Sequence, residues 1–301
     1  YQKGRTPNPD VLCNREVKFD LFVREAEKYQ ADYVATGHYC RKKTTEKEGK
    51  PVYSLYAGKD NNKDQSYFLC QISQDQLAKS LFPVGDIDKP EVRSIADTLQ
   101  LATAHRKDSQ GICFVGKVDL PQFLQQKLKP KQGDIIKISP DEILHAADVD
   151  IRELARPYDF SSMKGEKVGV HQGAHYFTVG QRRGLNVGGT QKPLYVIGTD
   201  VDRNVIYVGE GSDHPGLYRK ALFISVHEMH WLREDLAMHT GEEADFDFRI
   251  RYRQPLQPGS LMVREEGAYI RFKERQRGIT PGQFAAWYKN DELIGSGVIH
   301  A

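Results

Sequence analysis

The stretch A-D-Y-V-A-T-G-H-Y, residues 31–39, decides the fold together with the helical pattern that leads into it. Apolar residues recur before it at i, i+3, i+4 and i+7, which predicts a helix from about Asn14 to Tyr29. A helix followed by a short apolar strand indicates an open α/β sheet. Ligands of such sheets bind at the carboxyl ends of the strands, where Gly37 and His38 fall. From spacing alone, His38 is equally compatible with a surface loop.

Cys13 lies directly upstream of this unit, in G-R-T-P-N-P-D-V-L-C-N-R, residues 4–15. Its prolines exclude regular structure, so the helix is expected to begin near Asn14. The N–H groups of a helix start favour a thiolate at Cys13, and Arg15 and Lys18 add positive charge. This setting predicts a reactive thiol. The alternative is a small apolar residue that packs at a helix start.

The chain has three other cysteines. Cys113 lies in the polar, glycine-punctuated segment D-S-Q-G-I-C-F-V-G, residues 108–116, and is the second candidate for sulfur chemistry. Cys70 lies in an apolar run that predicts a buried, inert thiol, and Cys40 is either structural or undecided. No C-x-x-C pair or cysteine–histidine quartet occurs, so we expect neither a disulfide framework nor a metal site.

The composition is that of a globular protein. The 301 residues are 39% apolar and 28% charged, which is enough for two or three domains. No apolar run approaches the length of a membrane span and no secretion signal is recognisable, so we expect a cytoplasmic protein without a membrane segment. The net charge of +2 is too small to predict nucleic-acid binding by itself.

The pattern changes to β-rich from Gly133 onward. Four short runs of β-branched and aromatic residues are interrupted by glycine and are predicted as strands: residues 133–138, 175–185, 193–201 and 204–211. The interval from Ser139 to Gly165 resembles an inserted helical segment. A third region begins near Leu217.

This third region contains the most basic strand pattern of the chain. F-D-F-R-I-R-Y-R, residues 246–253, alternates strictly, which places its three arginines on one face of a predicted strand. A-Y-I-R-F-K, residues 268–273, repeats the pattern, with Ile270 and Phe272 inward and Arg271 and Lys273 outward. Two such strands would form a stripe that follows a phosphate backbone. A merely solvated face is the alternative.

Six motifs, in order along the whole chain, closely resemble the tRNA-specific 2-thiouridylase (MnmA) family and its mitochondrial counterparts. They are residues 4–19, A-T-G-H-Y at 35–39, K-D-Q-S-Y-F-L at 63–69, residues 108–116, F-T-V-G-Q-R-R-G-L at 177–185 and R-Y-R-Q at 251–254. The resemblance implies a doubly wound α/β ATP-pyrophosphatase domain over 1–129, a β-rich central domain over 130–216 and a tRNA-binding β-barrel over 217–301.

The reaction that the resemblance implies is thiolation of the wobble uridine of the tRNAs for Lys, Glu and Gln. Mg-ATP adenylates the C2 oxygen of the uridine, and a cysteine persulfide then supplies sulfur while AMP leaves. The sulfur comes from a cysteine desulfurase, directly or through relay proteins. Cys113 matches the persulfide carrier. Cys13 matches the second catalytic cysteine, which attacks the persulfide or the activated base and leaves a transient Cys13–Cys113 disulfide.

The remaining functional residues are carried over by motif. Asp10 matches a candidate general acid or base, and Asn8, Pro9 and Asp10 are implied to line a flipped uridine. Gly37 matches an ATP-contacting position. Seven further positions match tRNA contacts: His38, Lys63, Asp64, Gln65, Arg251, Tyr252 and Gln283.

The family's pyrophosphate loop, S-G-G-V-D-S-S, does not occur in this sequence, which begins at Tyr1 within motif-rich sequence. We therefore expect a chain that lacks this N-terminal segment. The alternative function is a catalytically inactive tRNA-binding fragment of such an enzyme. An unrelated ATP-pyrophosphatase, such as a 4-thiouridine or lysidine synthetase, would require other motifs around the cysteines.

Overall fold

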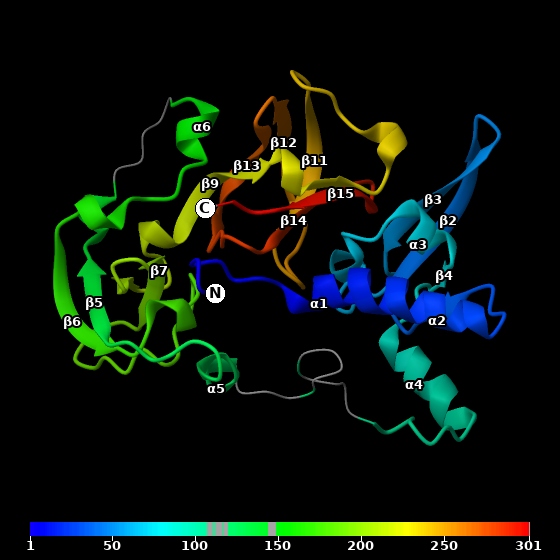
Figure 1. Ribbon diagram of the computed structural model, residues 1–301, viewed down its shortest axis with the longest axis horizontal. Helices are drawn as coiled ribbons and strands as arrows, with labels where there is room; N and C mark the ends of the chain where they lie inside the picture. Colours follow the sequence, from blue (N-terminus) through cyan, green and yellow to red (C-terminus); the bar gives the residue numbers. More distant parts are fainter. Residues whose placement is uncertain (107–110, 112–115, 117–119, 144–148, 301) are drawn as a thin grey trace.

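The structure is a computed structural model that describes residues 1–106, 111, 116, 120–143 and 149–300. Three groups of elements are visible in Figure 1: the N-terminal helices with a long hairpin, a small sheet, and a large sheet formed mainly by the C-terminal third. The architecture is mixed α/β followed by β, as the sequence predicts. Cys113 lies outside the described residues.

The first helix begins at Pro9, not at Asn14 as the sequence pattern predicts. α1 (Pro9–Cys13) continues without a break through a π-helical segment, Asn14–Leu21, into α2 (Phe22–Lys28). Pro9 occupies the first turn, where a missing N–H is harmless, and the Asn8 side chain caps the helix. Cys13 is therefore the last residue of α1, and the expected stabilisation of its thiolate by a helix N-terminus is wrong.

A two-stranded parallel sheet follows the first helix. β1 (Val34–Ala35) pairs with β4 (Ser80–Leu81), so the predicted strand forms and Gly37 lies just beyond its carboxyl end. α3 (Gln74–Ala78) precedes β4 and is closed by a capping box from Ser73 to Gln76. α4 (Lys89–Thr98) follows Asp88 and has a proline in its first turn.

The large sheet has nine strands and includes residues from both ends of the chain. Its order is β2-β3-β15-β14-β11-β12-β13-β9, and β10 pairs with β15. The bounds are β2 (Cys40–Lys47), β3 (Lys50–Ala57), β9 (Tyr218–Ser225), β10 (Met229–Trp231), β11 (Glu243–Arg249), β12 (Gln257–Arg264), β13 (Gly267–Arg277), β14 (Phe284–Lys289) and β15 (Glu292–Val298). Leu55 opposite Leu293 and Tyr56 opposite Glu292 join the early hairpin to the last strand.

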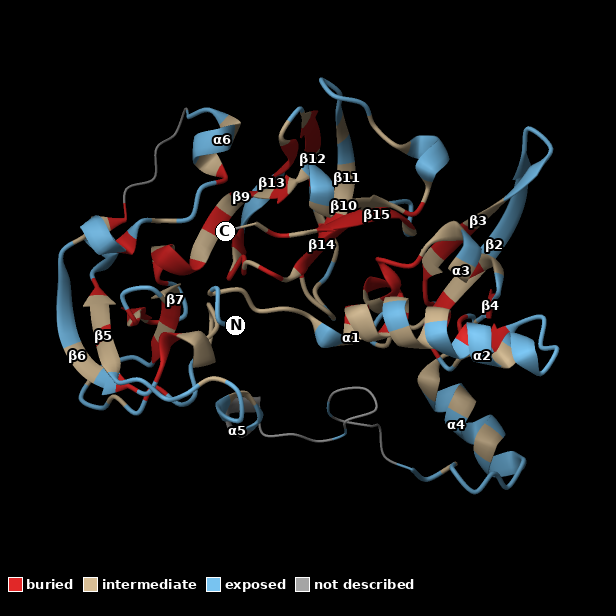
Figure 2. Ribbon diagram, viewed as in Figure 1, coloured by how far each residue is buried: buried red, intermediate tan, exposed pale blue. Residues whose placement is uncertain are grey.

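The hydrophobic core also joins the first region of the chain to the C-terminal strands. One cluster of fully buried side chains combines Val11 and Phe19 from the first helix with Leu55 of β3 and with Tyr288 and Leu293 of the C-terminal strands. A second cluster fills the C-terminal sheet around Phe248, Phe272 and Trp287. Figure 2 shows buried residues along β14 and β15 and exposed ones at the tip of the β2–β3 hairpin. The first and third regions therefore share one core.

The central region is a four-stranded sheet with the order β6-β5-β8-β7. Its strands are β5 (Gly133–Ile138), β6 (Gly165–His171), β7 (Leu194–Asp200) and β8 (Val205–Glu210), preceded by α5 (Leu120–Gln125). Three of the four predicted runs form strands. The run at 175–185 forms turns instead, whereas β6 was not predicted because its glycines and exposed lysine obscure the alternation. The interval from Ser139 to Gly165 contains short helical turns, including α6 (Ile151–Leu154).

The predicted basic strand is wrong in its second half. β11 ends at Arg249, and the chain then bends through Arg253, which has a positive φ of 63°. Arg249 is buried instead of lying on an outer face. β13 follows the prediction, because Ile270 and Phe272 are buried while Arg271 and Lys273 are exposed.

No helix in the described part of the chain is long and apolar enough to cross a membrane.

Candidate functional site

The cap of the first helix links two predicted site residues that are far apart in the sequence. Asn8 Oδ1 accepts hydrogen bonds from the N–H groups of Asp10 (3.2 Å) and Val11 (3.3 Å). Asn8 Nδ2 donates to Gln283 Oε1 at 3.3 Å, and Gln283 Nε2 donates to the Thr6 carbonyl at 2.9 Å. The start of the helix is thereby held against the loop that leads into β14.

Asp10 and Cys13 lie on the same side of this helix, three residues apart. Asp10 Oδ1 is buried and has no hydrogen-bond partner among the described residues. Asn14, one residue beyond Cys13, is buried and donates to the carbonyls of Asp10 (3.0 Å) and Phe68 (3.2 Å). A carboxylate oxygen with unused acceptor capacity, held beside a partly exposed thiol, can accept or return a proton.

The turn after β11 brings Arg251 and Tyr252 to the same region. The Arg251 guanidinium donates to the Gly278 carbonyl, and burial together with nearby Arg277 lowers the pKa of Arg251. The Tyr252 ring packs on Phe68 with a centroid separation of 4.3 Å. The Phe68 carbonyl accepts a hydrogen bond from Asn14, so this turn and the Cys13 helix both contact Phe68, the turn through its ring and the helix through its backbone.

The K-D-Q segment is held by a buried ion pair. Asp64 is 3% exposed and accepts hydrogen bonds from the N–H groups of Gly58 and Ser66, both at 3.0 Å. Its other oxygen accepts from Arg249, whose guanidinium lies 5.5 Å from the centre of the Tyr288 ring. The carboxylate of Asp64 therefore does not reach the surface, and the tRNA contact at this position stays a prediction.

Two neighbours of Asp64 remain partly exposed. Lys63 is of intermediate exposure, as is Gln65, whose Oε1 accepts a hydrogen bond from the Tyr39 N–H at 3.1 Å. The segment therefore presents Lys63 and part of Gln65 to solvent, while Asp64 fixes its backbone.

His38 belongs to the core, contrary to the expected tRNA contact. It is 8% exposed, its Nδ1 lies 2.8 Å from Thr36 Oγ1, and its ring packs at 5.8 Å from Phe19. Burial, with a contribution from Lys18, lowers the pKa of His38 to about 3. Gly37, in contrast, is exposed, and a Cβ added there would contact nothing within 4 Å. Its backbone is open to close approach by a ligand.

The burial of His38 predicts a pH dependence of stability. The folded protein holds this imidazole neutral down to pH of about 3, whereas the unfolded chain protonates it near pH 6.5. Because the unfolded state binds the extra proton, the free energy of unfolding should fall as pH drops below about 6.5. The slope from this group is at most about 1.4 kcal/mol per pH unit.

Urea denaturation of the wild type and of His38→Phe between pH 7 and pH 5 measures this slope. His38→Phe should show a shallower decline than the wild type, because its replacement side chain does not titrate. Equal slopes would contradict the prediction.

Two of the other cysteines are inert, as predicted for Cys70 and left open for Cys40. Both are fully buried, and burial raises the pKa of Cys70 to about 12 and that of Cys40 well above its usual range. Cys13, of intermediate exposure, is the accessible cysteine within the described residues.

Several residues of this region were not predicted. Tyr67 is fully buried and donates a hydrogen bond to the Phe284 carbonyl at 3.0 Å. Thr6 Oγ1 lies 3.1 Å from Thr178 Oγ1, which connects the N-terminal segment with the central region. The only signal for these residues is their place in the S-Y-F-L and F-T-V-G motifs, because sequence spacing contains no information on such distant contacts.

Comparisons with known proteins cover nearly the whole chain. Three family models match: the tRNA methyl transferase HUP domain at residues 1–117, the tRNA methyl transferase PRC-barrel domain at 153–210 and the aminomethyltransferase beta-barrel domain at 222–299. A protein of Christiangramia forsetii named tRNA-specific 2-thiouridylase MnmA is 57% identical over 99% of this chain and 78% of its own length. Proteins with the same name from Flavobacterium johnsoniae and Karelsulcia muelleri are 56% and 43% identical over the same shares.

Proposed function

This chain belongs to the tRNA-specific 2-thiouridylase family, and we propose that it transfers sulfur to C2 of the wobble uridine in the tRNAs for Lys, Glu and Gln. The observation that supports the site is the Asn8–Gln283 hydrogen bond, which holds the Asp10–Cys13 helix against the C-terminal sheet. A substrate that contacts both regions then lies beside the thiol. The two cysteine motifs favour sulfur over the methyl group that two of the family-model descriptions mention. As a tRNA-modifying enzyme, it would act in the cytoplasm.

ATP is the proposed co-substrate, and it enters as the Mg²⁺ complex because its phosphates supply the oxygen ligands that Mg²⁺ prefers. Its chemical contribution is to turn the C2 oxygen into part of a good leaving group, AMP. Gly37 fits a contact with the nucleotide, since it lies exposed at the carboxyl end of β1 with open space around its Cα.

The sulfur step is proposed to use both cysteine motifs. The terminal sulfur of a Cys113 persulfide, supplied by a cysteine desulfurase or a relay protein, attacks C2 as AMP leaves. The Cys13 thiolate then attacks the Cys113 sulfur, breaks the S–S bond and releases 2-thiouridine. A Cys13–Cys113 disulfide remains, which an external thiol reduces. Asp10 is proposed to take the Cys13 proton, which its position three residues away on the same helix and its unpartnered Oδ1 support.

The tRNA surface is proposed to combine Asn8, Pro9, Lys63, Gln65, Arg251, Tyr252 and Gln283. Asn8 and Gln283 are hydrogen-bonded to each other, and Tyr252 packs on Phe68 beside Asn14 of the Cys13 helix. The three domains are proposed to cover residues 1–129, 130–216 and 217–301. The shared core of the first and third regions supports a binding surface that is rigid across both.

The assay that tests this function is detection of 2-thiouridine by mercury-gel shift. Unmodified tRNA for Glu is incubated with the chain, Mg-ATP, a cysteine desulfurase with free cysteine as the persulfide source, and an external thiol that reduces the Cys13–Cys113 disulfide. A shifted band confirms the sulfur transfer. Binding of the tRNA without any shift would instead identify a tRNA-binding chain without catalytic activity.

Arg251 provides a prediction for tRNA binding. Each phosphate contact contributes about −0.7 to −0.9 to the slope of log affinity against log salt concentration. Arg251→Gln should weaken tRNA binding and reduce the magnitude of this slope by about one such contact. Lys50→Gln, at the exposed tip of the β2–β3 hairpin, is the control and should leave the slope unchanged. Fluorescence anisotropy at four salt concentrations measures both. An unchanged slope in Arg251→Gln would remove Arg251 from the tRNA surface.

A further inference from the structure

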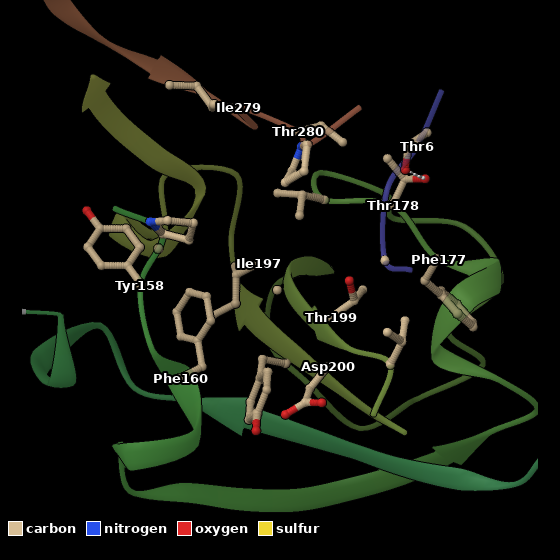
Figure 3. Close-up of a pocket in the computed structure, with 18 of the residues that line it drawn as sticks. Thr6, Tyr158, Phe160, Phe177, Thr178, Ile197, Thr199, Asp200, Ile279 and Thr280 are labelled. Carbon is tan, nitrogen blue, oxygen red and sulfur yellow. Dashed lines mark hydrogen bonds between the residues drawn. The ribbon is translucent and has the colours of Figure 1, made fainter. Parts of the chain in front are cut away.

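A pocket of about 400 Å³ lies between the central sheet, the N-terminal segment and the strand end near Thr280. Figure 3 shows Phe160, Ile197 and Thr199 from the central region on one side and Thr6 and Thr280 on the other. The pocket is large enough for a nucleotide, and its walls come from three separate regions of the chain. Neither Asp10 nor Cys13, the proposed catalytic residues in the described part of the chain, lines it.

One wall of the pocket contains a buried arginine with unused hydrogen-bonding capacity. Arg219, on β9, is 9% exposed, and one of its terminal nitrogens donates to the Ala155 carbonyl. Its Nε–H has no hydrogen-bond partner among the described residues. Burial lowers the pKa of Arg219 to about 10, which still leaves it charged at neutral pH. A buried N–H without a partner is costly, so an acceptor atom supplied by a ligand would be favourable.

A second wall is aromatic. The Phe160 ring lies 5.7 Å from that of Tyr158 and 5.6 Å from that of Tyr207. Phe160 and Tyr207 are buried in the core of the central sheet, so Tyr158, which is of intermediate exposure, is the ring of this wall that can stack on a planar heterocycle. Thr199 and Asp200 add a hydroxyl and a carboxylate at the end of β7, which can accept hydrogen bonds from N–H groups of a ligand.

The charged residues around the pocket further restrict the class of ligand that can bind there. The lining includes two cationic residues, Lys3 and Arg219, and three carboxylates, those of Asp159, Asp200 and Asp202. Arg203 lies 3.8 Å from the Asp200 carboxylate, so the charges nearly cancel, which provides no cationic excess for a polyphosphate such as ATP. A planar ligand with an acceptor for Arg219 and a neighbouring N–H for a carboxylate fits best.

The pocket is continuous with the proposed tRNA surface. Thr6 lines it, and the Thr6 carbonyl accepts a hydrogen bond from Gln283. Gln283 in turn contacts Asn8, next to the helix of Cys13. An RNA strand that contacts Gln283 therefore lies next to Thr6, a residue of the pocket lining.

We propose that this pocket binds one unstacked RNA base of the uracil or guanine type, in addition to the uridine that is modified. Both bases present a carbonyl oxygen next to a ring N–H on one edge, and the lining supplies an unpartnered donor, the Arg219 Nε–H, and a carboxylate acceptor, Asp200. Adenine offers no carbonyl there. The proposal rests on the proposed function only in that the ligand is part of a tRNA; the pocket chemistry stands without the sulfur step.

Saturation-transfer NMR with the nucleoside monophosphates of uracil, guanine and adenine tests the proposal on the full chain. The variants are Thr199→Phe, which fills the pocket on a strand that tolerates aromatic residues, and Thr45→Phe, a matched control on the exposed face of the β2–β3 hairpin. We expect signals from the uracil and guanine rings with the wild type and the control, and their loss in Thr199→Phe. The adenine signal should be weaker than either.

The same variants are then compared in binding to unmodified tRNA. Thr199→Phe should raise the Kd about ten-fold, because the stacking of one base is lost, whereas Thr45→Phe should leave it unchanged. Arg219→Lys, which keeps the charge but loses the Nε–H, should reduce the preference for uracil and guanine over adenine. Equal ring signals in wild type and Thr199→Phe would overturn the proposal, even if the chain thiolates tRNA. A chain that shows the ring signals but no thiolation would refute the proposed function alone.

Discussion

Cys13→Ser is expected to abolish formation of 2-thiouridine, with a loss of at least about a thousand-fold in rate. A serine hydroxyl remains protonated at neutral pH and is a poor nucleophile towards a sulfur–sulfur bond, whereas a thiolate is well suited to it. Binding of tRNA should be unchanged, because Cys13 contributes a thiol of intermediate exposure and no charge to the surface. The mercury-gel assay measures product, and anisotropy measures binding.

Cys70→Ala is the matched control for this experiment. Cys70 is fully buried among core residues, so its replacement should lower stability slightly and leave the thiolation rate of the folded protein unchanged. Cys113→Ser should prevent formation of the persulfide and preserve tRNA binding. A Cys13→Ser variant with activity within ten-fold of the wild type would exclude Cys13 as the nucleophile, and a wild-type level of persulfide in Cys113→Ser would move the carrier elsewhere.

Asp64→Ala is expected to have the largest effect on stability, about 3–5 kcal/mol. Removal of the carboxylate leaves Arg249 buried without a counter-charge and removes the acceptor for the Gly58 and Ser66 N–H groups. The free energy of unfolding from urea titration measures the effect. The double variant Asp64→Ala with Arg249→Met should recover a large part of the loss, because it also removes the unpaired charge.

An exposed ion pair provides the comparison. Lys28 and Glu25 lie 2.6 Å apart on α2 with both side chains more than half exposed. Glu25→Ala should change the free energy of unfolding by no more than about 0.5 kcal/mol. If Asp64→Ala were equally mild, the buried pair would not hold the K-D-Q segment in place.

Sequence patterns correctly predicted those helices and strands that are determined by residues close to them in the sequence. The strand at residues 34–35 and the strands β5, β7 and β8 form where short apolar or β-branched runs indicated them. The start of the first helix was misplaced because Pro9 was interpreted only as a breaker, although proline is favourable in a first helical turn. Asn8 before it was the cap signal.

The sequence motifs predicted which residues belong to the site, but they did not predict which of those residues are buried or which lie in contact. His38 and Asp64 lie in polar segments, yet tertiary packing buries both, His38 against Phe19 and Asp64 against Arg249. Sequence alternation cannot reveal such burial, because it depends on tertiary contacts with other elements, the first helix for His38 and the end of β11 for Asp64. The contact between Asn8 and Gln283, separated by 275 positions, is of the same kind.

The pairing of β3 with β15 has a consequence for the order in which the protein folds during synthesis. Tyr56 and Glu292 are hydrogen-bonded across 236 positions, and the core around Phe19 is completed by Tyr288 and Leu293. At roughly 5–20 residues per second, the ribosome needs on the order of ten seconds or more to make the intervening segment. During this time the edge of β3 that later pairs with β15 has no partner. Chaperone binding to the nascent chain is therefore expected to persist until the last strand emerges.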